Sequence, residues 1–214
     1  MLFGDKETIV FAGDSVTDAG RQGFEGQRFG GLGTGYVSAF DAMLAVSYPD
    51  KCFRVCNMGV GGDNVLRLSA RWNEVMELKP DHLFICIGIN DVWHLYGAPE
   101  RNWHDIDTFE EEYEKLIASS KDKVKTITLM TPYYMEPNKD DAVRAEMDRY
   151  GAIVKKLAAK YNFKCIDLQA AFDKFLKHKH SSFLAWDRVH PGPVAAHLIA
   201  REILRAIDFD GDFI

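Results

Sequence analysis

The chain has 214 residues, 47% of them hydrophobic and 27% charged, which is typical of a globular protein with one sizeable core. Its formal net charge of -6 argues against nucleic acid and anionic membrane surfaces as partners, since both attract basic proteins. No apolar run reaches the ~20 residues needed to cross a bilayer. The first residues, MLFGDKETIV, lack the basic and apolar regions of a signal peptide. We therefore expect a single domain over residues 1–214.

The first predicted element is Thr8–Ala12, a short and fully apolar strand that Gly13 ends. Asp14 and Ser15 follow it directly. A serine in this place is favoured as the N-cap of a helix. It is also where a nucleophile would stand at the carboxyl edge of a sheet. The strand alone leaves both interpretations open.

The segment Arg21–Tyr36 contains six glycines, including the run GLGTG. No strand leads directly into it, so a dinucleotide-binding fingerprint is a weak interpretation, and we expect a loop beside the site. The second predicted strand is Phe53–Asn57. It continues into NMGVGGDNV, Asn57–Val65, and then into an amphipathic helix, Asn64–Leu78.

The third predicted strand, His82–Ile89, ends in the block GIND, Gly88–Asp91. The next segment, Trp93–Asp107, carries two tryptophans and two histidines and is expected to be a loop at a binding edge or a subunit contact. A fourth strand, Lys125–Met130, precedes a long amphipathic helix, Asp140–Lys160.

The last predicted elements are a fifth strand, Phe163–Leu168, and a helix, Pro193–Ile207, preceded by the block WDRVHP, Trp186–Pro191. Apolar strands that alternate with helices predict a three-layer α/β/α sandwich around a five-stranded parallel sheet with flavodoxin-like strand order. Ligands bind such sheets beyond the carboxyl ends of the strands. We therefore expect the blocks that follow the strands to converge on one crevice.

The cysteine pattern gives no sign of a metal site. Cys56, Cys86 and Cys165 lie in strand-like segments, so we expect buried free thiols. No CxxC motif or paired histidines accompany Cys52 and Cys56, which makes a zinc site improbable. Free thiols without an export signal favour a cytoplasmic location.

The chain resembles the SGNH hydrolases of the GDSL esterase family. It carries the four blocks in which that family has a Ser, a Gly, an Asn and a His, in the same order and over nearly its whole length. Within the family, the motifs AGDSVTDAGR, GTGYV, IGINDVW, MTPYYM and AWDRVHP look most like the intracellular acetyl xylan esterases. The resemblance implies the SGNH hydrolase fold and a serine esterase that needs no metal or organic cofactor. The implied substrate is an acetylated saccharide, above all O-acetyl groups on xylo-oligosaccharides or related carbohydrates.

By this resemblance Ser15 is the nucleophile, His190 the general base and acid, and Asp187 its partner. The chemistry agrees, because a serine hydroxyl needs a base and the base needs an orienting group. Asp187 precedes His190 by three residues, so one short turn can direct the carboxylate toward the imidazole. Each residue alone would be read as a cap, a surface charge or a structural histidine. Their conjunction at successive strand ends favours the catalytic interpretation.

The family pattern also implies an oxyanion hole formed by the backbone N–H groups of Ser15 and Gly62 and the side-chain amide of Asn90. Gly61 precedes Gly62, so either glycine is a candidate for this N–H. Gly62 is favoured because it follows Asn57 by five residues, which is the spacing of the family.

Four residues are candidates for substrate binding. Trp93 and Trp186 lie within three residues of a site residue and are expected to flank the crevice, with Arg188 and Arg21 as polar edges for a sugar ring. The alternative enzyme reading is a short-chain lipid esterase, thioesterase or lysophospholipase of the same family. A catalytically silent module that holds an acylated ligand, or a flavodoxin-like cofactor protein, are further alternatives. A homo-oligomer is compatible with the aromatic-rich loop and the resemblance.

Overall fold

The computed structural model describes residues 3–22, 30–97 and 104–210. Its strands form one parallel sheet in the order β2-β1-β3-β4-β5. This order confirms the flavodoxin-like arrangement expected from the sequence. The strands are β1 (Thr8–Gly13), β2 (Arg54–Gly59), β3 (His82–Cys86), β4 (Thr126–Met130) and β5 (Lys164–Ile166).

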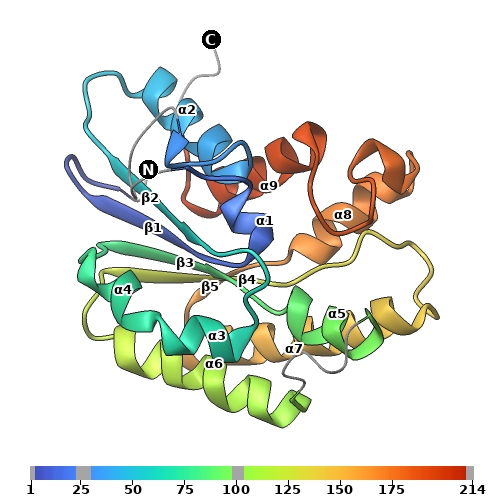
Figure 1. Cartoon of the computed structure of the whole chain (residues 1–214). Helices are drawn as coiled ribbons and strands as arrows, with labels where there is room; N and C mark the ends of the chain where they lie inside the picture. The colour runs from blue at the N-terminus through green and yellow to red at the C-terminus, as the bar shows by residue number, and fades with distance from the viewer. Residues whose placement is uncertain (1–2, 23–29, 98–103, 211–214) are drawn as a thin grey trace.

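Helices cover both faces of the sheet, which gives the expected three layers (Figure 1). One layer contains α1 (Ser15–Asp18), α2 (Tyr36–Ser47), α8 (Leu168–Leu176) and α9 (Pro193–Ala206). The other contains α3 (Val65–Ala70), α4 (Trp72–Glu77), α5 (Ile89–Gly97), α6 (Ile106–Ser120) and α7 (Ala142–Tyr161). Helix α2 packs against α9, and α3 packs against α6. A short 3-10 helix, Ser181–Phe183, precedes the last site block.

The central strands are apolar along their whole length because both of their faces are covered. Phe11 and Phe84 are direct partners across β1 and β3, and their rings stack with centroids 4.7 Å apart. Phe40 of α2 meets the Phe11 ring edge-on at 5.2 Å. This aromatic core fixes the register of β1 and so the position at which the strand delivers residue 15.

The helix expected over Asn64–Leu78 is two helices, α3 and α4, which meet at Arg71. Arg71 has φ -108° and ψ 15°, and these angles interrupt the α-helical path. Its side chain bonds to Asp63 and to the end of β1, and this contact gives the break a physical reason.

Two strands are shorter than expected, and one predicted loop is partly helical. Strand β3 stops at Cys86 because α5 begins at Ile89, and β5 stops at Ile166 because Asp167 caps α8. The predicted loop Trp93–Asp107 contributes its first residues to α5. Residues 98–103 of that loop, and residues 23–29 of the glycine-rich segment, lie outside the described residues.

All four cysteines are free thiols. Cys56 and Cys86 are buried as expected, whereas Cys165, on the edge strand β5, is exposed. Within the described ranges, no helix combines the length and apolar character that a membrane span requires.

Candidate active site

Helix α1 begins at Ser15, and a single residue, Asp14, separates it from the end of β1. The cap of this helix is Asp14, whose Oδ1 accepts a hydrogen bond from the backbone N–H of Val16 at 2.9 Å. The capping role that a serine could have filled is therefore taken by its neighbour. The hydroxyl of Ser15 is left for another partner.

That partner is His190. The Ser15 Oγ lies 2.9 Å from the His190 Nε2, and the His190 Nδ1 lies 2.5 Å from Oδ2 of Asp187. The three side chains thus form one chain of hydrogen bonds, although Ser15 and His190 are 175 residues apart in sequence. The structure brings together the three residues that the sequence suggested as a triad, in the order of contacts that activates a serine.

Asp187 is held in its charged form. Its Oδ1 accepts hydrogen bonds from the backbone N–H groups of Val189 and His190, at 3.0 and 2.8 Å. Burial acts to raise the pKa of Asp187, but the hydrogen bonds from the His190 ring and these two N–H groups outweigh it, so the pKa is lowered. Asp187 is therefore a carboxylate at neutral pH and favours a positive imidazole beside it.

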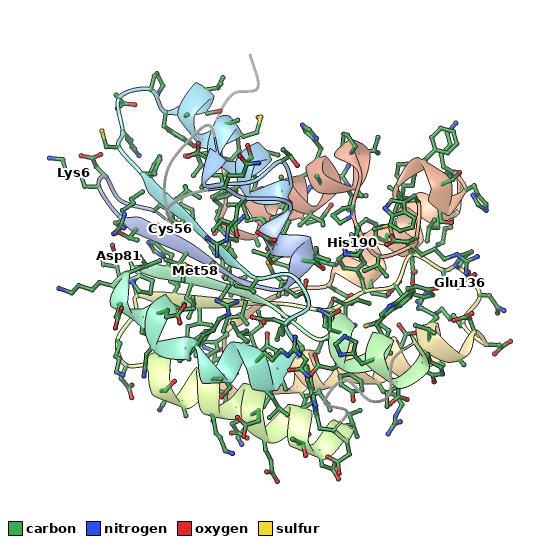
Figure 2. All side chains as sticks on the ribbon, in the orientation of Figure 1. Lys6, Cys56, Met58, Asp81, Glu136 and His190 are labelled. Carbon is green, nitrogen blue, oxygen red and sulfur yellow. The ribbon has the colours of Figure 1, made fainter. Side chains whose placement is uncertain are left out.

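The turn that carries Asp187 and His190 is supported by the segment after β4. Arg188 has a left-handed φ of 66°, and its carbonyl accepts from the N–H of Met135 at 2.9 Å. The hydroxyl of Tyr133 donates to the carbonyl of Val189 at 3.2 Å, and Arg188 forms an ion pair with Glu136 at 2.8 Å. Glu136 and His190 are both labelled in the right half of Figure 2.

The predicted oxyanion residues lie on the loop after β2 and at the start of α5. Gly62 has φ 81°, a conformation that a side chain disfavours. A Cβ built on Gly61 would lie 4.0 Å from the Cβ of Ser15, so this loop runs directly beside the serine. The Nδ2 of Asn90 donates one hydrogen to the carbonyl of Asp63 at 2.7 Å. An amide nitrogen carries two hydrogens, so the second is available to a ligand.

Asn57 holds this edge together, although the sequence used it only as a spacing marker. Its side chain is fully buried, donates to the carbonyls of Thr17 and Leu32 at 2.7 and 3.0 Å, and accepts from the N–H of Gly59 at 2.9 Å. A Cβ on Gly59 would lie 2.1 Å from the backbone nitrogen of Asp18, so helix α1 packs directly on the end of β2. In the sequence, the only sign of this structural role is that a polar residue stands at the end of a buried strand.

Three acidic side chains, those of Asp14, Asp63 and Asp91, are buried beneath the serine. Burial, together with the charges of Asp91 and Asp63, raises the pKa of Asp14 to about 8, although the hydrogen bond from the N–H of Val16 acts to lower it. Asp14 is therefore protonated at neutral pH. Asp91 accepts from the N–H of Val65 at 3.0 Å and pairs with the ring of His104 at 2.9 Å.

The four predicted substrate residues differ in what they contact. Trp186 is 87% exposed beside Asp187, and Trp93 is 38% exposed with its ring 6.2 Å from that of Tyr134. Arg188 is paired with Glu136, as described above. The Nε of Arg21 donates to the carbonyl of Gly59 at 2.9 Å, so this arginine also supports the end of β2.

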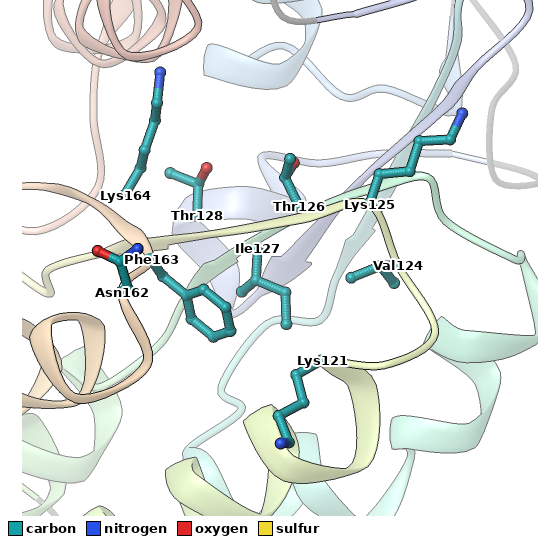
Figure 3. A pocket seen from close by; sticks show the side chains of 9 residues that line it. All are labelled: Lys121, Val124, Lys125, Thr126, Ile127, Thr128, Asn162, Phe163 and Lys164. Carbon is teal, nitrogen blue, oxygen red and sulfur yellow. The ribbon is translucent and has the colours of Figure 1, made fainter.

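A cavity of about 260 Å³ lies elsewhere, where α6 ends and β4 and β5 begin. Figure 3 shows Ile127 and Phe163 on one side of β4 and Thr126 and Thr128 on the other. None of the predicted site residues lines this cavity. Its lysines have acidic partners: Lys125 pairs with Glu7 and Asp81, Lys164 with Asp208, and Lys121 lies 3.8 Å from Asp122. Within residues 3–22, 30–97 and 104–210 there is also no cluster of three metal-ligating side chains.

The fold and the serine-histidine-aspartate arrangement are those of a serine hydrolase on a parallel α/β sheet. The model of the GDSL-like lipase/acylhydrolase family matches residues 11–198. The chain belongs to this family and is a carboxylic ester hydrolase.

Individual relatives show which members of the family the chain is similar to. The chain is 46% identical over 216 residues to an acetylxylan esterase of Geobacillus stearothermophilus, covering 98% of each sequence. The crystal structure of that organism's acetylxylan esterase Axe2 matches with a TM-score of 0.94 at 43% identity, covering 98% of each chain. An α/β-hydrolase from the metagenome of Lake Arreo, Spain, matches at 0.92 and 38% identity, again over 98% of each chain.

Solved variants of the Geobacillus enzyme bear on the site. Three of them, called catalytic mutants, replace a serine, a histidine or an aspartate by alanine. The replaced serine is residue 15, and the replaced aspartate precedes the replaced histidine by three residues. In this chain the serine has the same number, Ser15, and Asp187 precedes His190 by the same three residues.

Proposed function

We propose that this enzyme hydrolyses O-acetyl esters of xylo-oligosaccharides, with Ser15 as the nucleophile. The observation that carries the proposal is the continuous line of hydrogen bonds from Ser15 through His190 to Asp187. The similarity to acetylxylan esterase over 98% of both chains supports the acetyl group and the sugar as substrate.

In the proposed reaction, His190 takes the proton of the Ser15 hydroxyl while the oxygen attacks the acetyl carbonyl. The backbone N–H groups of Ser15 and Gly62 and the free amide hydrogen of Asn90 stabilise the negative oxygen of the tetrahedral intermediate. His190 then gives this proton to the sugar oxygen as its bond to the acetyl carbon breaks, so that the sugar leaves with a hydroxyl group, and Asp187 stabilises the imidazolium in between. Water, activated by the same histidine, hydrolyses the acetyl-enzyme and releases acetate.

The open side of the site suits a sugar. Trp186 presents most of its indole to solvent next to Asp187, and a flat aromatic face of this kind packs well against a sugar ring. In one solved variant of the relative, called an acetyl-xylooligosaccharide esterase, isoleucine replaces the tryptophan immediately before the aspartate. Trp186 occupies the corresponding place here, directly before Asp187.

The test is Ser15→Ala, with Ser119→Ala on α6 as the matched control. Because Asp14 caps α1, Ser15→Ala should leave the free energy of unfolding nearly unchanged while turnover of acetylated xylo-oligosaccharide falls by several orders of magnitude. The control should retain full activity. Both proteins are also treated with a serine-directed organophosphate, and only the control should become labelled. A folded Ser15→Ala enzyme that still turns over would remove Ser15 from the mechanism.

Two further proposals concern the setting of the enzyme. We propose a reducing compartment, the cytoplasm, which the four free cysteines support. We also propose a homo-oligomer, for which the exposed aromatic side chains of Tyr96 and Phe183 provide apolar surface. Sedimentation of the purified protein tests the second proposal.

A further inference from the structure

We propose that Arg71 is a positioning residue that fixes the distance between the nucleophile and the oxyanion loop, the segment of residues 60–64. This inference rests on the proposed function, because it concerns the same site. It extends that function to a residue outside the site predicted from the sequence. In the sequence, Arg71 lies inside the predicted helix Asn64–Leu78, and no motif singles it out.

The contacts of Arg71 connect two segments that meet only in the folded protein. Its Nε donates to Oδ2 of Asp63 at 2.6 Å, and its Nη2 donates to the carbonyl of Gly13 at 3.0 Å. The side chains of Arg71 and Asp63 are only 13% and 7% exposed. A guanidinium has several donors in one rigid plane, so it can hold both acceptors in a fixed relation.

These two contacts of Arg71, with Asp63 and with Gly13, are called the clamp below. Each of the two segments that it joins carries proposed catalytic groups. Gly13 lies two residues before Ser15, at the end of β1. Asp63 follows Gly62 in the chain, and its carbonyl accepts the hydrogen bond of the Asn90 amide at 2.7 Å. A shift of Asp63 would therefore move two of the three proposed oxyanion donors, those of Gly62 and Asn90, relative to the serine. The clamp ties them to the strand that carries the nucleophile.

The backbone of the oxyanion loop is tied to the same point. The N–H of Val60 donates to the carbonyl of Gly13 at 3.1 Å, so this carbonyl accepts from the start of the loop as well as from Arg71. The break between α3 and α4 falls at Arg71 itself. The chain therefore leaves its helical path at the residue whose side chain closes the clamp.

The ion pair of Arg71 and Asp63 also compensates the negative charge of Asp63. Asp63 lies near Asp14 and Asp91, and all three are buried. Without the guanidinium, a carboxylate at position 63 would be unpaired in this acidic region, and the loop would move to bring it to solvent. The displacement would separate the oxyanion donors from the point at which they have to converge.

The test is Arg71→Met, with Arg149→Met as the matched control. Arg149 lies on α7, where it pairs with Glu146 on the protein surface. We expect Arg71→Met to lower kcat per active site by roughly 10- to 100-fold, since small misplacements of catalytic groups have effects of that size. KM should change by less than about threefold, because ground-state binding of the ester does not use the oxyanion hole. The control should match the wild-type protein in both constants.

Two readouts separate positioning from loss of folded protein. Active sites are counted by titration with an organophosphate, and kcat is expressed per titrated site. The inhibition constant of a small alkylboronic acid, which forms a tetrahedral serine adduct, should rise by about the same factor by which kcat falls. A variant that is merely less stable would have fewer titrated sites with unchanged kcat and boronate affinity per site. That result would overturn the proposal.

A second variant covers the case in which Arg71→Met does not fold. Arg71→Met combined with Asp63→Asn removes the unpaired buried charge but also lacks the clamp, so the same loss of kcat is expected. Wild-type kcat in the double variant would overturn the role of Arg71. Failure of the wild-type protein itself to react with organophosphate would instead contradict the proposed serine mechanism, so the two failures are distinguishable.

Discussion

At the residue scale, the adjacent side chains of Asp14 and Ser15 have different roles at the end of β1. The Asp14 side chain accepts from the N–H of Val16 in the first turn of α1, and Ser15 therefore does not need to cap the helix. Asp14 can do this from a fully buried position because it holds a proton at neutral pH. The hydroxyl beside it faces His190. A cap and a candidate nucleophile thus occupy consecutive positions without competing.

The protonation of Asp14 makes a prediction about stability and pH. Its pKa is about 8 in the folded protein against 3.8 for an unperturbed aspartate, so between these values the folded state keeps a proton that the unfolded state has released. The contribution of Asp14 to the free energy of unfolding therefore falls as pH rises through this window. Asp14→Asn keeps the side-chain oxygen but cannot ionise. Relative to wild type, the variant should gain stability from pH 5 to pH 8, by up to about 4 kcal/mol.

The measurement is denaturant unfolding of both proteins at several pH values. Asp105→Asn is the matched control, because Asp105 caps α6 in the same way but its pKa is lowered. Asp105 is ionised in both the folded and the unfolded states from pH 5 to pH 8, so the difference between that variant and wild type should be constant there. A constant difference for Asp14→Asn as well would show that Asp14 is charged in the folded enzyme.

At the element scale, the ends of helices and strands set the geometry of the site. The turn of Asp187 and His190 leaves the 3-10 helix and enters α9, and the segment after β4 supports it through Met135, Tyr133 and Glu136. Helix α7 is fixed at both ends: Asp141 caps its start, and Asn162 ends it with a left-handed φ of 54°. Few residue types adopt that conformation readily.

Asn162 supports a prediction about stability alone. Asn162→Ala places a Cβ in the left-handed region without the local hydrogen bonding of asparagine, so the free energy of unfolding should fall by about 1 kcal/mol. Asn162→Gly should be neutral or slightly stabilising, because glycine is the preferred residue at such an end. Urea unfolding measures both variants, and esterase activity should be unchanged in each. An alanine variant as stable as wild type would contradict the strain assigned to this position.

At the scale of the whole molecule, the site is an open edge of the sheet. The imidazole of His190 is 46% exposed and Trp186 is 87% exposed, so a long acyl chain would leave much of its surface in water. Each methylene that is buried contributes about 0.8 kcal/mol, and an open site gains little of this. A sugar ring, which is polar at its edge, loses less by remaining partly hydrated.

This shape predicts a preference for short acyl groups. Acetyl esters should be hydrolysed much faster than octanoyl or longer esters, as measured by kcat/KM on p-nitrophenyl esters of two to twelve carbons beside acetylated xylose. Ser119→Ala provides the control for preparation effects. A rate that rises with chain length, or good activity on lysophospholipid with negligible activity on acetylated xylose, would favour the lipid-esterase alternative.

Much of the fold could be predicted because buried strands and helices have characteristic hydrophobic patterns in the sequence. The apolar runs located the five strands, and their order followed from the rules of parallel sheets. The ends were less predictable. Ile89 and Leu168 are as apolar as the strands before them, yet each begins a helix. Hydrophobic pattern alone does not separate the last residue of a buried strand from the first of a buried helix.

The sequence by itself determined the class of fold, the order of the site blocks and the residue types of the triad, since these depend on local pattern and on chemistry that few side chains perform. Tertiary structure decided what supports those residues. The buried bonds of Asn57, the clamp of Arg71 on Asp63 and Gly13, and the support of the catalytic turn after β4 join segments far apart in the chain. Their side chains look ordinary in sequence. Only folding brings a carbonyl or a carboxylate within hydrogen-bonding distance of each, and a buried polar group is stable only where such a partner exists.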